Sequence, residues 1–176
     1  MGLVHIYCGD GKGKTSAAVG LAVRAAGCGK RVVIARFLKT DNSGEVEILK
    51  KIPEVTLIPC RKTFGFVRSM DEETKRECAA YHRELFGEAV KLAEHADLVV
   101  FDEIMAAVNY GMVPERDVLE FLENRPGRDQ TDGLEIVLTG RDPSEKLTAA
   151  ADYVSEICKR KHPFDRGIMA RRGVEY

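Results

Sequence analysis

The feature that most constrains this chain is a glycine- and lysine-rich segment near its start. It follows an apolar run over residues 3–8 and precedes an alanine-rich run over residues 17–28, which predicts the order strand, turn, helix. The segment consists of Gly9, Asp10, Gly11, Lys12, Gly13, Lys14, Thr15 and Ser16. Glycines let successive backbone N–H groups turn toward an anion, and the helix N-terminus adds its positive dipole end. The segment therefore predicts a phosphate-binding loop.

Two side chains of this loop receive roles from the pattern GxxxxGK[ST]. Lys14 is predicted to contact phosphate, and Thr15 is predicted to hold Mg²⁺ through its hydroxyl. The first position of the pattern is Cys8 instead of glycine, so the match is incomplete. The prediction rests on context, because a strand ends at the loop and helix-forming residues follow without a break. At the end of a buried strand, Cys8 is interpreted as inert packing.

Composition argues against several classes of protein. The 176 residues include 27 Lys and Arg against 28 Asp and Glu, a balance that disfavours nucleic-acid binding. No apolar run approaches the roughly 18 residues of a membrane span, and the first residues lack a signal-peptide pattern. The five cysteines lack metal-binding spacing and are interpreted as small buried hydrophobes in a reducing compartment. We expect one cytoplasmic domain over residues 1–176, with neither nucleic acid nor membrane as partner.

Apolar runs alternate with helical patterns along the rest of the chain. Strands are predicted over residues 31–38, 55–58, 98–101, 134–139 and 153–157, and helices over residues 71–95, 114–124 and 143–151. Asp71 is the expected cap of the first of these helices. Loops are expected over residues 40–44, 60–70 and 125–133. This alternation predicts a three-layer α/β fold of the P-loop NTPase (RecA-like) type, with a mostly parallel central sheet and right-handed crossovers.

Two acidic residues, Asp102 and Glu103, directly follow the apolar run over residues 98–101. Mg²⁺ prefers hard oxygen ligands and commonly takes one or two carboxylates, so these residues and Thr15 form the predicted metal site. The alternative is that the acidic pair only caps the next helix. The phosphate loop favours the metal site, and with it ATP and Mg²⁺ or Mn²⁺. Guanine is disfavoured, because the Asn/Thr-Lys-x-Asp element has no match late in the chain.

Further segments, in a consistent order, resemble one family: the P-loop ATP:corrinoid adenosyltransferases. The resemblance rests on residues 7–18, 37–39, 44–45, 102–104, 125–127, 138–141, 161–164, 167–168 and 173–176. It implies transfer of the 5′-deoxyadenosyl group of ATP to the cobalt(I) of a corrinoid, with release of triphosphate, in adenosylcobalamin biosynthesis or salvage. It also implies that ATP lies in the loop in the opposite sense to that of other P-loop enzymes. Lys14, Thr15 and Mg²⁺ would then stabilise the leaving triphosphate.

The resemblance also implies roles for residues outside the loop. Phe64 and Phe66 match two aromatic positions that take the space of the corrinoid's lower axial ligand. Relatives can carry Trp at the second position, whereas this chain has no Trp. The alternative for each is an ordinary core phenylalanine. Lys39, Glu45 and Arg141 are expected at the nucleotide, with a plain surface position as the alternative for Arg141.

The family resemblance further implies a homodimer, and a flavoprotein or free flavin as the reductant of the corrinoid. Two other functions stay open on the sequence. One is a small-molecule kinase or ATPase, which would release ADP, and the other is an ATP-gated module that binds a corrinoid without reacting. Lys161 and His162 belong to a basic run that is interpreted as a solvated face, with His162 in a structural hydrogen bond.

Overall fold

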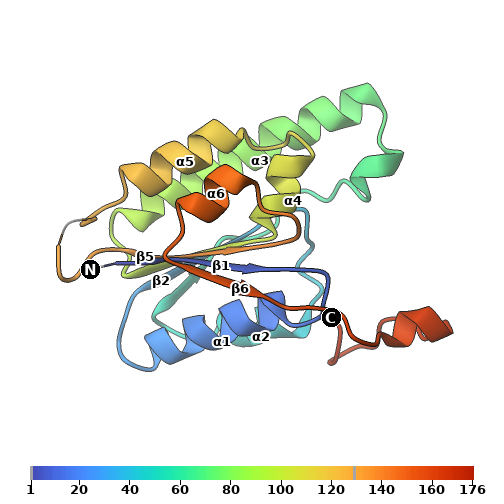
Figure 1. The fold of residues 1–176 in the computed structure, drawn as a ribbon, viewed down its shortest axis with the longest axis horizontal. Helices are drawn as coiled ribbons and strands as arrows, with labels where there is room; N and C mark the ends of the chain where they lie inside the picture. Colours follow the sequence, from blue (N-terminus) through green and yellow to red (C-terminus); the bar gives the residue numbers. More distant parts are fainter. Residues whose placement is uncertain (1, 129) are drawn as a thin grey trace.

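A six-stranded parallel sheet forms the middle layer of the computed structural model, which describes residues 2–128 and 130–176 (Figure 1). The strand order is β3-β2-β4-β5-β1-β6, and neighbouring strands pair in parallel. The strands are β1 Val4–Cys8, β2 Val32–Arg36, β3 Val55–Leu57, β4 Leu98–Asp102, β5 Glu135–Thr139 and β6 Tyr153–Glu156. The predicted α/β fold with a parallel sheet is confirmed.

Helices cover both faces of this sheet. In Figure 1, α1 and α2 lie below the sheet, and α3, α4, α5 and α6 lie above it. The helices are α1 Lys14–Ala26, α2 Gly44–Leu49, α3 Glu72–Ala93, α4 Ile104–Asn109, α5 Glu115–Glu123 and α6 Glu145–Ala149, and two 3-10 turns are η1 Val67–Ser69 and η2 Pro163–Arg166. The predicted cap of α3 is confirmed, because the Asp71 carboxylate accepts a hydrogen bond of 2.7 Å from the backbone N–H of Thr74.

Several boundaries differ from the predictions. Helices α2 and α4 were not predicted, because six residues are too few to establish a helical period in the sequence. The strand expected over residues 31–38 ends at Arg36, and Leu38 has a φ of 53°, which turns the chain away from the sheet. The predicted loop over residues 125–133 includes Asp129, which lies outside the described residues.

The prediction that the cysteines are buried holds for only part of the set. Cys8 and Cys78 are buried, whereas Cys60 is half-buried and Cys28 and Cys158 are exposed. Cys28 lies in the turn after α1 and Cys158 follows β6, so the two exposed thiols lie in connecting segments, where the sheet and helices do not enclose the chain. Over residues 2–128 and 130–176, no helix has the length and apolar character to cross a membrane.

The apolar core is largest on the face covered by α3 and α5. Every residue of β2 and β4 is buried, as expected for central parallel strands with both faces covered. Phe101 of β4 is fully buried, and its ring centroid lies 5.4 Å from that of Phe86 and 5.5 Å from that of Phe121. The next residue is Asp102, so this packing holds the end of β4 in place at the edge where the site forms.

The substitution Phe101→Ala should lower the free energy of unfolding by about 3–5 kcal/mol, because it leaves a cavity among packed rings. Urea denaturation followed by circular dichroism measures the change. Phe66 is 87% exposed, so Phe66→Ala is the matched control and should change the free energy by less than about 0.5 kcal/mol. A loss below about 1 kcal/mol for Phe101→Ala would contradict the central place of this ring.

Candidate functional site

The phosphate loop connects β1 to α1 and is closed by the segment after β6. The N–H of Gly11 donates a 2.7 Å hydrogen bond to the carbonyl of Ile157. A Cβ added at Gly9 or Gly11 would lie 2.5 or 2.7 Å from that carbonyl oxygen, and Gly9 and Gly13 have φ values of 98° and 125°. The close approach at Gly9 and Gly11 leaves no room for a side chain, and the positive φ of Gly9 and Gly13 would strain any residue that has one. The loop therefore requires the glycines that the sequence places there.

Lys14 of the loop and Arg141 from the end of β5 both bond to backbone carbonyls of this loop. The ammonium of Lys14 donates hydrogen bonds of 2.8 Å to the carbonyls of Gly9 and Gly11. Partial burial lowers the pKa of Lys14, and the nearby charge of Arg141 lowers it further. The guanidinium of Arg141 also reaches the carbonyl of Asp10, at 3.4 Å. The structure therefore brings Arg141 from the end of β5 to the loop, where both charges favour an anion.

Asp102 is the buried centre of a polar network at the edge of the sheet. Its side chain is 3% exposed, and its Oδ1 accepts hydrogen bonds from the hydroxyls of Thr15, at 3.0 Å, and Thr139, at 2.7 Å. The ammonium of Lys39 donates to the hydroxyl of Thr15 at 2.8 Å and forms a short ion pair with Oδ2 of Asp102. Three of these residues were predicted, whereas Thr139 was missed because a threonine that ends a buried strand carries no distinctive pattern.

Glu103 follows this network and does not serve as a side-chain cap. It lies at the N-cap of α4 with a left-handed φ of 62°, and its N–H donates to the hydroxyl of Thr139 at 2.8 Å. Within the described residues, its carboxylate makes no capping hydrogen bond. The carboxylate of Asp102 is bonded to side chains of other elements. The alternative that this acidic pair only caps the next helix is therefore not supported.

The oxygens of Thr15 and Asp102 fit a hard divalent cation. They already surround a positive charge, because the ammonium of Lys39 bridges the hydroxyl and the carboxylate. In the described parts of the chain, no three His, Cys, Asp or Glu residues gather closely enough to hold a metal by themselves. A site with few protein oxygens is typical of Mg²⁺, which keeps water or phosphate oxygens as its other ligands.

Two pockets open beside this network. The first, of about 870 Å³, we call the α1–α2 pocket, and it is lined by Thr15, Ser16, Val19, Gly20, residues 38–40 and 42–45, and residues 173–176. The second, of about 510 Å³, we call the Phe66 pocket, and it is lined by Leu38, Lys39, residues 65–68, Glu103, Ala106 and Tyr110. The pockets share Leu38 and Lys39 and therefore meet beside the Asp102 network.

The wall of the α1–α2 pocket is shaped by the segment after β2. The buried guanidinium of Arg36 donates a 2.8 Å hydrogen bond to the carbonyl of Thr40 and pairs closely with Asp41. These contacts hold the turn that leads into α2. Glu45 of α2 lines the pocket, and its expected position at the nucleotide stays a prediction. The sequence did not predict the helix that carries it.

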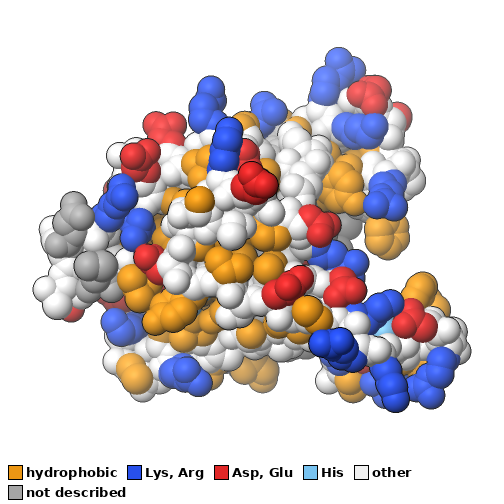
Figure 2. Space-filling model, in the orientation of Figure 1, with side chains coloured by type: hydrophobic (Ala, Val, Ile, Leu, Met, Phe, Trp, Pro, Cys, Tyr) orange, Lys and Arg blue, Asp and Glu red, His pale blue; other side chains and the backbone are white. Residues whose placement is uncertain are grey.

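The structure separates the two phenylalanines that the sequence paired. Phe64 is half-buried, and its ring centroid lies 5.6 Å from that of Tyr81 and 6.4 Å from that of His82. Phe66 is 87% exposed and lines its pocket. The alternative of an ordinary core phenylalanine therefore describes the packing of Phe64 but does not account for the exposed ring of Phe66. Two lobes project from the molecule, one carrying η1 and the other η2 (Figure 1). Figure 2 shows hydrophobic side chains on their facing sides, with a gap between them.

Two loop side chains are bonded to the segment after β6 and to the end of the chain. The carboxylate of Asp10 accepts a 2.8 Å hydrogen bond from the N–H of Lys159, which lowers the pKa of Asp10. Lys12 pairs with Glu175 at 3.2 Å. The sequence did not predict either contact, because residues far apart in the chain make them.

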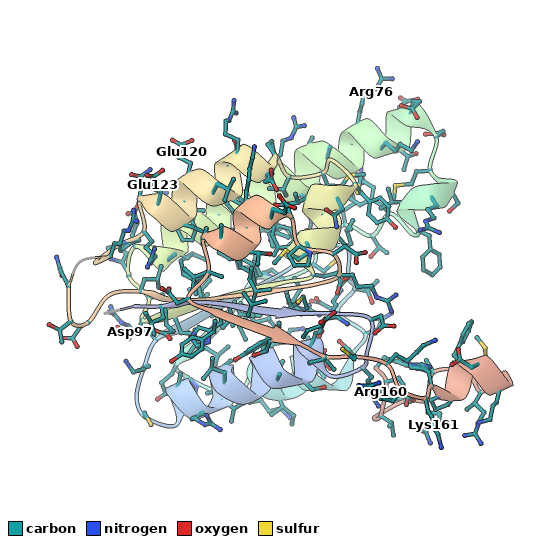
Figure 3. The ribbon with its side chains drawn as sticks, viewed as in Figure 1. Arg76, Asp97, Glu120, Glu123, Arg160 and Lys161 are labelled. Atoms are coloured by element: carbon teal, nitrogen blue, oxygen red, sulfur yellow. The ribbon has the colours of Figure 1, made fainter. Side chains whose placement is uncertain are left out.

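The basic run after β6 behaves as the sequence predicted. Arg160 and Lys161 are exposed and lie at the base of the lobe that carries η2 (Figure 3). Nδ1 of His162 accepts a hydrogen bond of 3.2 Å from the N–H of Phe164, which is the expected structural role.

Comparisons with known proteins agree with this geometry. A family model described as "ATP:corrinoid adenosyltransferase BtuR/CobO/CobP" matches residues 1–176. The chain belongs to this family. It is 34% identical over 178 residues to "Corrinoid adenosyltransferase" of Escherichia coli K12, covering 99% of this chain and 86% of that protein. It is 34% identical to "Corrinoid adenosyltransferase CobA" of Salmonella typhimurium and 30% identical to a "Corrinoid adenosyltransferase" of Pseudomonas aeruginosa, with 86% and 84% of those chains covered.

As a corrinoid adenosyltransferase of cobalamin biosynthesis or salvage, the protein uses ATP and a corrinoid as substrates. The predicted family, enzyme class and reaction are confirmed at this level. The family model matches the whole chain. This match does not agree with a small-molecule kinase or ATPase, or with a module that binds a corrinoid without reacting.

Behind Phe64, the adenosyltransferase buries a histidine whose titration should affect stability. His82 is 3% exposed, and burial lowers its pKa to about 4. The unfolded chain therefore binds more protons at this residue between pH 4 and pH 6.5, so lowering the pH favours unfolding. We expect this residue to reduce the free energy of unfolding by about 2 kcal/mol between pH 7.5 and pH 5.

Urea denaturation of wild type and His82→Gln at the two pH values isolates this effect, because other titrating groups contribute equally to both proteins. The decrease should be smaller in the variant by about the stated amount. An equal decrease in both proteins would show that His82 is not the responsible group.

Proposed function

We propose that the triphosphate of ATP lies in the loop over residues 9–16, the adenosine in the α1–α2 pocket and the corrinoid in the Phe66 pocket. The observation that carries this proposal is that the two pockets share Leu38 and Lys39. The first pocket extends to Thr15 of the loop, and the second contains the exposed ring of Phe66. Substrates bound in them would meet at the shared residues, with the 5′ carbon of ATP facing the cobalt.

The reaction in this arrangement is a displacement at carbon. Cobalt(I) donates an electron pair to the 5′ carbon, the bond from that carbon to oxygen breaks, and its electron pair leaves with the triphosphate. Cobalt is formally oxidised to cobalt(III). Because no proton is transferred in this step, the protein needs no general base. Its contribution is to position both substrates and to stabilise charge on the leaving group.

The phosphate loop supplies that stabilisation. Lys14 and Arg141 contact backbone carbonyls of the loop in the structure, so both charges lie at the loop proposed to hold the triphosphate. Their attraction grows as negative charge accumulates on the leaving oxygen, so they favour the transition state over the bound substrate. Ser16, at the start of α1, and Glu45, on α2, are proposed to contact the phosphate and the ribose from the wall of the same pocket.

Mg²⁺ or Mn²⁺ would be held by Thr15 and Asp102, with Glu103 at the same edge of the sheet. When bound, the cation would withdraw charge from the triphosphate oxygens. The position of Lys39 supports this assignment, because its ammonium bridges the two proposed ligands. A divalent cation would compete with this ammonium, and Lys39 lines both pockets into which its side chain would be released.

Phe66 is proposed to occupy the space of the lower axial ligand of the corrinoid, and Phe64 to anchor the segment that presents it. Cobalt(I) is too electron-rich to form readily while a donor is attached below it, so an apolar side chain in that space favours reduction. The exposure of Phe66 and the ring contacts of Phe64 support this division of roles. The single domain over residues 1–176, the homodimer, the flavin reductant and the cytoplasmic location stay predictions.

The product of the reaction tests the main proposal. The protein is incubated with ATP, Mg²⁺ and a chemically reduced corrinoid, and the cobalt(I) absorbance is followed together with the phosphate products. We expect one triphosphate for each adenosylated corrinoid. Lys14→Ala should lower kcat/KM by about 100-fold, because it removes a charge that faces the leaving group.

The control for Lys14 is Lys75→Ala, which breaks only the exposed pair with Glu72 on α3 and should leave the kinetics unchanged. Formation of ADP with an unalkylated corrinoid would refute the assigned reaction. Unchanged kinetics in Lys14→Ala would refute the role assigned to the loop.

Phe66→Ala separates reduction from alkylation. We expect a loss of at least about tenfold when the reaction starts from cobalt(II) and a smaller loss when free cobalt(I) is supplied, because the ring is proposed to act on the lower ligand. The two assays use the same variant, so each controls for changes in folding and ATP binding. Equal losses in both would contradict ligand displacement.

A further inference from the structure

The last residues of the chain fold back onto the phosphate loop. Residues 171–176, which we call the C-terminal turn, are closed by hydrogen bonds from the N–H of Glu175 to the carbonyl of Arg171, at 2.9 Å, and from the N–H of Gly173 to the carbonyl of Tyr176, at 2.6 Å. Gly173 has a φ of 75°, which a residue with a side chain adopts only with strain. The turn is therefore an ordered element with its own backbone bonds.

Glu175 fastens this turn to the loop. Its carboxylate accepts three hydrogen bonds from Arg171, from the backbone N–H at 2.8 Å and from the guanidinium at 3.0 and 3.1 Å. On its other side it pairs with the ammonium of Lys12 at 3.2 Å, and the Glu175 side chain is 19% exposed. The hydrogen bonds from Arg171 lower the pKa of Glu175 to about 2, so the carboxylate is ionised at neutral pH. One acid thus joins the turn to the phosphate loop.

The turn also forms part of the wall of the α1–α2 pocket. Val174 and Tyr176 line this pocket and are 52% and 49% exposed, so each presents about half of its surface. Val19 and Leu38 add apolar surface to the same pocket. A purine base needs such surface for its faces, and an aromatic ring that is half exposed is suited to stacking.

The polar lining of the pocket suits the rest of a nucleoside. Asn42, Ser43 and Glu45 line it as well, and they offer hydrogen-bond partners for ribose hydroxyls. Thr15 and Ser16 connect the pocket to the phosphate loop. The C-terminal turn therefore lies where it can contact a nucleoside, while its only charged link to the loop runs, over the described residues, from Glu175 to Lys12.

We propose that Glu175 is a positioning residue that holds the C-terminal turn against Lys12, and that Val174 and Tyr176 form the wall that contacts the adenosine of ATP. This inference rests on the proposed placement of ATP. It makes the turn a specificity element for the nucleoside, distinct from the loop that binds the triphosphate. ATP should gain affinity from the turn, whereas inorganic triphosphate should not.

Separate titrations with ATP and with inorganic triphosphate test this inference by calorimetry. Tyr176→Ala should weaken ATP binding by about tenfold and leave triphosphate binding unchanged, because the lost stacking surface faces only the nucleoside. Tyr153→Ala is the matched control, since Tyr153 is 52% exposed on β6 and stacks on His5; it should change neither affinity. Equal weakening of both ligands, or no effect on ATP, would overturn the role of Tyr176.

Lys14→Ala distinguishes failure of this inference from failure of the proposed function. It should weaken both ATP and triphosphate, because its charge faces the phosphates. If Lys14→Ala leaves triphosphate binding intact, the placement of the triphosphate is wrong. If Lys14→Ala behaves as expected but Tyr176→Ala does not, only the role of the turn is wrong.

The positioning role of Glu175 is tested with Glu175→Gln and the conservative Glu175→Asp. Glu175→Gln should raise KM for ATP severalfold, more than it lowers kcat, and should accelerate tryptic cleavage after Arg171 and Arg172, because the turn is no longer held. Glu175→Asp should restore part of both properties. Glu72→Gln, which breaks only an exposed pair on α3, is the control. A lower kcat with an unchanged KM in Glu175→Gln, or an unchanged rate of tryptic cleavage, would refute the positioning role of Glu175.

Discussion

The site depends on one buried carboxylate. Asp102 is almost inaccessible to water, and a carboxylate in such a position is stable only when its oxygens are paired. It meets this requirement by bonding to Thr15 at the start of α1, Thr139 at the end of β5 and Lys39 beyond β2. Three segments that are distant in sequence therefore meet at Asp102, because its buried charge requires a partner from each of them.

The sheet explains why this charge lies at the reaction site. Strand β4 is central and buried, with Phe101 packed among other rings immediately before Asp102. In a parallel sheet the carboxyl ends of all strands share one edge, and ligands bind outside that edge. Apolar packing along β4 and charge pairing at its end thus act on consecutive residues. The same arrangement holds Thr15 at the α1–α2 pocket and Lys39 where the two pockets meet.

Much of this organisation could be predicted from local patterns. The loop over residues 9–16 has its glycines where the backbone needs positive φ or close approach to Ile157, and the acids at 102–103 follow an uninterrupted apolar strand. The short helix α2 could not be recognised, since six residues do not establish a period. The different environments of Phe64 and Phe66 also escaped prediction, because burial depends on α3 packing over one ring and not over the other.

The sequence by itself determined the phosphate loop, the alternation of strands and helices, and the family, because each depends on residue types at short spacing. Only the tertiary structure decided which residues share a pocket. It joined Lys39 to Asp102 across 63 positions and Lys12 to Glu175 across 163. Contacts of this kind follow from strand order and from the pairing of charges across the fold, and neither leaves a local pattern in the chain.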